Sequence, residues 1–273
     1  MAAKRNDHGF FQDIDKRDRI DVSLEKDLYF FAECARLAYK DRETGVDAFK
    51  AIGFTSHSFI SVDSAQVHCA ANKQRVIISF RGTQPIQFGD VVADINFFPT
   101  KQKHGEGTVH QGFKEEVDKV EDAVLKFIKR HYDKAIYVCG HSLGGAMATI
   151  FTARHEDLVE KLYTYGSPRA GNGKFIKLLT TPHHRCVNNN DIVAHIPPSI
   201  YFRHHGDIHY LNFWGFNRKL HGWQKTKDTW RGILAAAKRG QFFDFLTDHS
   251  CQKYSDYLKR NWLEVDLEED LLV

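Results

Sequence analysis

Short apolar segments typical of buried β-strands alternate along the chain with amphipathic helices, and this alternation most constrains the fold. Residues 75–80, RVIISF, and residues 135–140, AIYVCG, each have the composition of a strand buried on both faces. Between them, residues 113–128 place apolar side chains on one helical face and charges on the opposite face. This order favours the α/β class, with a mostly parallel central sheet flanked by helices on both faces.

The same alternation extends over most of the chain. Before this unit we expect a helix at 28–38 and strands separated by turns at 63–64 and 72–73. After it we expect, in order along the chain, a helix at 142–156, a strand at 158–166, a short helix at 172–180, strands at 184–189 and 206–214, and helices at 229–240 and 250–258. No repeat or linker divides the sequence. We therefore predict a charged N-terminal arm at 1–24, one domain at 25–262 and an acidic C-terminal tail at 263–273, with 214–226 as a surface insertion.

Composition excludes several classes of partner and site. The formal net charge is only +3 over 273 residues and no block of Lys and Arg marks a nucleic-acid surface, so we expect no nucleic-acid partner. The five cysteines have irregular spacings unlike a disulfide framework or a zinc ribbon. Residues 1–22 contain no apolar run of the length of a signal or an anchor, so the sequence predicts a cytoplasmic protein without a transmembrane segment. The alternative is a secreted protein whose leader has been removed.

Residues 140–144, GHSLG, match the G-x-S-x-G pattern between a predicted buried strand and a predicted helix. In that context the serine lies on a strained turn that lifts its hydroxyl out of the sheet, and glycines leave room for the neighbouring backbone. We interpret Ser142 as a nucleophile. The alternative is a glycine-rich turn with no chemical role.

A serine nucleophile needs a histidine base and a carboxylate that orients it, and in this kind of fold both follow the serine in sequence. Asp191 comes just after the predicted strand 184–189, at the carboxyl end where open α/β sheets build their sites. Asp207 and Asp244 are competitors. The histidines after Asp191 are His195, His204, His205, His209, His221 and His249. We favour His249, in the last loop before the final helix, with His205 or His209 as the alternatives.

Two backbone positions are candidates for stabilising an oxyanion. Thr83 follows the strand 75–80, and Leu143 follows the serine, so each offers an N–H near the reacting carbonyl. For Thr83 the alternative is an ordinary strand-to-loop turn.

Five ordered motifs, FRGT, GHSLGG, YGSPRAGN, NNNDIVAHIPP and DHSCQKYSDYL, resemble the class 3 lipase family, which has the α/β-hydrolase fold. The resemblance implies that Ser142, Asp191 and His249 form a catalytic triad, with Thr83 and Leu143 as the oxyanion hole. It also implies a lid after the FRG strand, here residues 84–94, with an apolar face and a hinge at Gly89. The expected substrate-binding residues are Ile86, Phe88, His141, Val193 and Ile196.

The sequence thus predicts a serine carboxylester hydrolase, a triacylglycerol lipase or esterase that releases fatty acid through an acyl-enzyme without a metal or an organic cofactor. Its expected partners are an acylglycerol or another fatty-acyl ester and, transiently, a lipid–water interface. The alternatives are a phospholipase A1, a feruloyl-type esterase and a catalytically silent lipid-binding protein. A metal site at His204, His205 and His209 is the weaker interpretation, because only Asp207 accompanies them. We also expect Arg81 and Asp94 to form an ion pair at the base of the lid.

Overall fold

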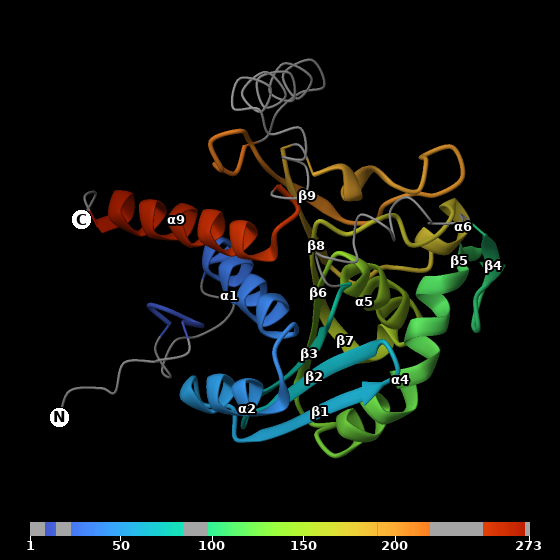
Figure 1. The fold of residues 1–273 in the computed structure, drawn as a ribbon, viewed down its shortest axis with the longest axis horizontal. Coiled ribbons are helices and arrows are strands. Elements are labelled where there is room, and N and C mark those ends of the chain that lie inside the picture. Colours follow the sequence, from blue (N-terminus) through green and yellow to red (C-terminus); the bar gives the residue numbers. More distant parts are fainter. Residues whose placement is uncertain (1–8, 15–22, 84–97, 190, 219–247, 271–273) are drawn as a thin grey trace.

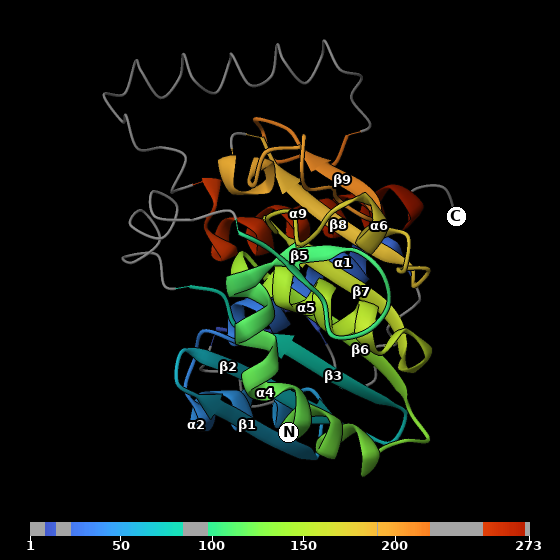
Figure 2. The same ribbon diagram turned by 90° about the vertical axis from the view of Figure 1, so that its right-hand side faces the viewer.

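A seven-stranded sheet forms the centre of the protein (Figure 1). This computed structural model describes residues 9–14, 23–83, 98–189, 191–218 and 248–270, the last six as backbone only. The strands of the sheet are β1 (Ser56–Val62), β2 (Ala65–Ala71), β3 (Arg75–Phe80), β6 (Ala135–His141), β7 (Val159–Tyr165), β8 (His183–Asn188) and β9 (Asp207–Leu211). They are neighbours in this order, as Figure 2 shows from bottom to top. The pairs β1–β2 and β2–β3 are antiparallel and the four later pairs are parallel, which confirms the predicted mostly parallel sheet.

Helices cover both faces of the sheet, as predicted. The helices α1 (Leu24–Leu37), α2 (Arg42–Ala51) and α9 (Cys251–Asp270) lie on one side, and α4 (Gln111–Lys129), α5 (Leu143–Arg154) and α6 (Gly173–Ile176) lie on the other (Figure 1). Two 3-10 turns, η1 (Glu156–Leu158) and η2 (Ile192–His195), precede β7 and follow β8. The short strands β4 (Pro99–Lys101) and β5 (Thr108–His110) form a separate two-stranded sheet, and Val109 of β5 also bridges Gly171.

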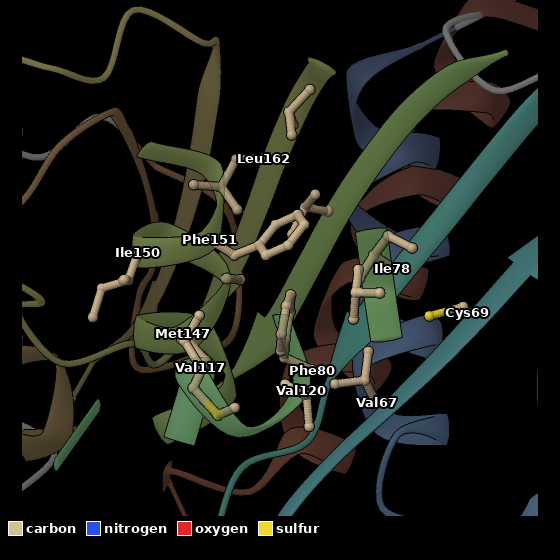
Figure 3. Packing of buried hydrophobic residues seen from close by; sticks show 14 of the residues in the cluster. Val67, Cys69, Ile78, Phe80, Val117, Val120, Met147, Ile150, Phe151 and Leu162 are labelled. Carbon is tan, nitrogen blue, oxygen red and sulfur yellow. The ribbon is translucent and has the colours of Figure 1, made fainter. Parts of the chain in front are cut away.

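Each face of the sheet packs against its helices through large apolar side chains. On the α4–α5 side, Phe80 of β3, Phe151 of α5 and Leu162 of β7 are fully buried (Figure 3). On the other side, Phe31 of α1 stacks on Tyr163 of β7 with 4.1 Å between ring centroids. The two buried faces explain why β3, β6 and β7 are apolar on both sides, and they hold the carboxyl ends of these strands in fixed positions.

The N-terminal segment packs more closely than its charge predicts. Residues Phe10 and Phe11 are each only 2% exposed and join the core beside α1. The Phe11 N–H donates to the buried Glu33 carboxylate at 2.6 Å, and Glu33 also forms an ion pair with Arg36 at 2.8 Å. Apolar side chains between charged neighbours therefore attach residues 9–14 to the domain, whose limits at 25 and 262 stay a prediction.

Several other elements differ from the sequence-based expectation. The final helix α9 continues to Asp270, beyond the expected end at 258, and so includes part of the predicted acidic tail. The helix α2 was not predicted: only Gly45, Ala48 and Phe49 are buried in it, too few for a clear apolar stripe, although Asp41 caps its first turn. The expected helix at 229–240, the insertion from residue 219 on and the lid at 84–94 with Asp94 lie outside the described residues.

The histidines considered as metal ligands do not come together. His205 stacks on His183, whereas His209 hydrogen-bonds His184 at 3.1 Å. Because His183 and His184 are successive strand residues, they point to opposite faces of the sheet. No group of three or more His, Cys, Asp or Glu is arranged to hold a metal ion within the residues that the structure describes. Among the same residues, no helix is long and apolar enough to span a bilayer.

Candidate active site

Ser142 occupies a strained turn between β6 and α5. Its φ is 58° and its ψ is −132°, a conformation that is unfavourable for a residue with a side chain. The surrounding backbone is closely packed, because a Cβ added at Gly144 would lie 2.2 Å from the Phe80 carbonyl oxygen. The glycine therefore lets the end of β3 approach the start of α5. A strained turn between a strand and a helix is the geometry expected of a nucleophile elbow, the turn that exposes a nucleophilic serine.

The Ser142 hydroxyl makes no hydrogen bond within the described part of the chain, although it is buried. Such an atom needs an explanation, since buried hydroxyls are normally paired. Leu143 begins α5, so its N–H is one of the helix N-terminal donors that have no acceptor within the helix. The Ser142 hydroxyl therefore lies directly beside the N-terminus of α5.

Asp191 and His249 form a buried acid–base pair. The His249 Nδ1 lies 2.8 Å from Oδ2 and 2.9 Å from Oδ1 of Asp191. Asp191 is 0% exposed and also accepts hydrogen bonds from the Tyr254 hydroxyl at 2.7 Å and the Val193 N–H at 3.0 Å. Three donors compensate the buried carboxylate, and the contact to Nδ1 makes Nε2 the lone-pair nitrogen of the neutral His249 ring.

The residue before the nucleophile connects Ser142 to His249. His141 Nε2 lies 2.7 Å from the His249 carbonyl oxygen, and the two rings are 4.5 Å apart between centroids. The turn after β7 closes the other side: a Cβ added at Gly166 would lie 2.4 Å from Asp191 Oδ2 and 3.0 Å from His249 Nδ1. The ends of β6, β7 and β8 and the start of α9 thus meet around Ser142, Asp191 and His249.

The end of β3 also reaches this point. A Cβ added at Gly82 would lie 3.1 Å from Ser142 Cβ, so the backbone that leads to Thr83 passes directly beside the nucleophile. Thr83 and Leu143 are both partly buried. The two predicted oxyanion positions therefore flank Ser142 from β3 and from α5.

The predicted substrate-binding residues have different environments. His141 is 4% exposed and both of its ring nitrogens have hydrogen-bond partners, so little of it faces solvent. Val193 is 2% exposed, Ile196 is partly buried, and Ile86 and Phe88 lie outside the described residues. Arg81 contacts Gln66 and packs against the ring of Tyr39.

Comparison with known proteins shows which family this site resembles. The family model of the class 3 lipases matches residues 77–201, the segment that contains Ser142 and Asp191. The lipase of Rhizomucor miehei is 33% identical over 164 residues, which cover 54% of this chain and 45% of that protein. Over this segment the chain is similar to the class 3 lipase family.

Other relatives show how far this family likeness extends. The toxin TseL of Vibrio cholerae is 30% identical over 184 residues, covering 65% of this chain and 28% of that protein. The aligned part is thus less than half the length of either relative. The structure of the Rhizomucor miehei triacylglyceride lipase superimposes with a TM-score of 0.57 at 25% identity, over 68% of this chain and 79% of that one. The predicted α/β-hydrolase fold is therefore confirmed.

Two contacts of this site were not predicted from sequence. Tyr254 is five residues after His249 within a motif that carries the family resemblance, and its hydroxyl binds Asp191. Tyr39 follows α1, and its hydroxyl lies 2.7 Å from His141 Nδ1. The distance of Tyr39 from the motifs in sequence left no local signal for its contact with the site.

Proposed function

We propose that the protein is a serine carboxylester hydrolase, most specifically a lipase that cleaves acylglycerols through an acyl-enzyme. The observation that carries this proposal is the buried contact of His249 Nδ1 with Asp191 beside a serine on a strained turn. The Rhizomucor miehei relative is a triacylglyceride lipase, which supports the choice of substrate. The proposed roles are nucleophile for Ser142, base for His249 and orienting acid for Asp191.

In the proposed reaction, the Ser142 hydroxyl attacks the ester carbonyl while His249 Nε2 accepts its proton. Asp191 stabilises the resulting imidazolium, and the backbone N–H of Leu143, together with Thr83, binds the tetrahedral oxyanion. His249 then returns the proton to the departing alcohol. Water repeats the sequence on the acyl-enzyme and frees the fatty acid. Every step uses residues of the chain itself, and the proposed partners are the fatty-acyl ester and a lipid–water interface.

A p-nitrophenyl butyrate assay with rapid mixing tests the reaction. We expect a burst of p-nitrophenol equal to the enzyme concentration, loss of this burst in Ser142→Ala, and a comparable loss of turnover in His249→Ala, because members of a triad act as one unit. Labelling by a p-nitrophenyl phosphonate should add one phosphonyl group at Ser142, as measured by peptide mass spectrometry. A wild-type protein that neither hydrolyses esters of any chain length nor becomes labelled would be a silent lipid-binding protein.

The substrate class needs a separate measurement. Rates on tributyrin below and above its solubility limit, compared with a phosphatidylcholine and a feruloyl ester at equal ester concentration, distinguish the three candidate activities. A higher kcat/KM for the acylglycerol is the expected result. Preference for the sn-1 ester of the phospholipid, or for the feruloyl ester, would replace the lipase assignment while leaving the acyl-enzyme chemistry intact.

We also propose a cytoplasmic location, supported by five cysteines that are all buried free thiols. Fractionation of the native cells, followed by detection of the protein in the soluble and the secreted fractions, tests this location. Recovery from the secreted fraction would establish the alternative.

A further inference from the structure

His141, the neighbour of Ser142, has a defined tautomer. It is 4% exposed, its Nε2 lies 2.7 Å from the His249 carbonyl oxygen and its Nδ1 lies 2.7 Å from the Tyr39 hydroxyl. A carbonyl oxygen only accepts, so Nε2 carries the hydrogen and donates it. In the neutral ring Nδ1 then accepts from the Tyr39 hydroxyl. Each nitrogen of His141 therefore connects the nucleophile turn to a different segment.

The surroundings of His141 keep its ring uncharged. Burial lowers the pKa of His141 well below its usual value, and the neighbouring His249 lowers it further, while the hydrogen bond to the His249 carbonyl opposes them. The groups that face this ring are the Tyr39 hydroxyl after α1, the His249 ring before α9 and the Tyr254 ring on α9. Behind Tyr39, the Arg81 guanidinium carbon lies 5.9 Å from the tyrosine ring centroid. A second positive charge in this position would therefore be unfavourable.

Tyr39 extends the connection to the end of β3. A Cβ added at Gly82 would lie 2.3 Å from the Tyr39 hydroxyl oxygen and 2.5 Å from the His141 carbonyl oxygen. Burial raises the pKa of Tyr39 well above its usual value, with a hydrogen bond from the Gly82 backbone acting in the opposite direction. The hydroxyl thus remains protonated and able to donate to His141. One oxygen contacts both the backbone leading to Thr83 and the ring beside Ser142.

We propose that Tyr39 and His141 are positioning residues for the acyl transfer: they hold the His249 loop and the end of β3 in register around Ser142, with His141 neutral throughout. This proposal rests on the proposed function. A neutral His141 matters because His249 becomes positively charged when it takes the serine proton, and the two rings are 4.5 Å apart between centroids. The hydrogen bond to the His249 carbonyl fixes the backbone of the base without competing for Nδ1 or Nε2 of its ring.

Tyrosine-to-phenylalanine variants separate positioning from general stability. Tyr39→Phe removes the donor to His141, whereas the control Tyr29→Phe removes a hydrogen bond from α1 to the Gln12 carbonyl, away from the site. For Tyr39→Phe we expect kcat on p-nitrophenyl butyrate to fall about tenfold with KM within about twofold, which corresponds to roughly 1.4 kcal/mol. Tyr29→Phe should keep kcat within about twofold. Equal kcat in the two variants would overturn the proposal.

Two changes at His141 test the tautomer and the charge. His141→Gln keeps one donor and one acceptor and cannot become charged, so it should retain most of the kcat that His141→Leu loses. Its acidic limb of kcat/KM against pH should coincide with that of the wild type. A displacement of that limb by one pH unit, or equal losses in both variants, would contradict a neutral positioning role.

A measurement that does not depend on activity completes the test. In ¹⁵N-labelled protein, the ring nitrogens of His141 should show the Nε2–H tautomer and no titration between pH 5 and 8. This result is independent of the proposed function, because it can be obtained even if the wild type hydrolyses no ester. Titration of His141 near neutral pH would overturn its neutral role, whereas absence of any esterase activity with an untitrated His141 would overturn only the function.

Discussion

Replacing Gly166 by alanine should damage the acid–base pair more than the fold. The added Cβ would lie 2.4 Å from Asp191 Oδ2 and 3.0 Å from His249 Nδ1, where ordinary contacts begin at 3.4 Å. The carboxylate must therefore move by about 1 Å, and a displacement of this size in a catalytic arrangement lowers the rate about 100-fold. The positive φ of 53° adds about 1–2 kcal/mol of backbone strain, and the crowding adds about 1–3 kcal/mol.

Gly9→Ala is the matched control for this change. Its φ is 67°, and a Cβ added there meets nothing within 4 Å, so it introduces similar strain without crowding. We would measure kcat and KM on p-nitrophenyl butyrate at a temperature where circular dichroism shows both variants folded, and the free energy of unfolding in urea. The expected result is a 100-fold lower kcat in Gly166→Ala alone. A folded Gly166→Ala protein with kcat within threefold of Gly9→Ala would refute the reasoning.

Two further predictions concern stability. Glu33→Ala should lower the free energy of unfolding, measured in urea, by about 3–5 kcal/mol, because it leaves the Arg36 charge and the Phe11 N–H without their buried partner. The control Glu116→Ala, which removes the surface pair with Lys119, should lower it by less than about 1 kcal/mol. Equal losses in the two variants would contradict the role of burial. Burial lowers the pKa of His68 to about 4, so between its unfolded value near 6.5 and pH 4 the unfolded chain binds a proton that the folded chain does not, and stability falls as the pH falls. His68→Gln should reduce this slope by up to about 1.4 kcal/mol per pH unit in urea titrations at pH 4–6.5, and an unchanged slope would show that His68 does not cause it.

The order of elements and the nucleophile turn could be predicted from local sequence. The runs at 75–80 and 135–140 are apolar on both faces because helices cover both sides of the sheet, and this pattern needs no distant information. The strain at Ser142 follows from its place between a buried strand and a helix. The same local patterns missed α2, where few side chains are buried, and ended the last helix at 258, whereas α9 continues through charged residues to Asp270.

Only the tertiary structure decided which distant side chains meet. The sequence left several histidines open as the base, and among those that the structure describes His249 lies against Asp191, 58 positions away along the chain. His205 and His209 share a short segment yet contact different partners, because adjacent residues of β8 point to opposite faces. Tyr39 reaches His141 across 102 positions of the chain, where α1 packs against the sheet.

By itself, the sequence determined a mostly parallel α/β sheet and a serine held on a strained turn, because strand burial and glycine spacing act between neighbours in the chain. The tertiary structure alone decided that Tyr39 donates to the ring beside that serine and that Tyr254 donates to Asp191. Hydrogen bonds between remote segments depend on how helices α1 and α9 pack against the sheet. No periodicity along the chain encodes that packing, since it is the sum of many weak contacts.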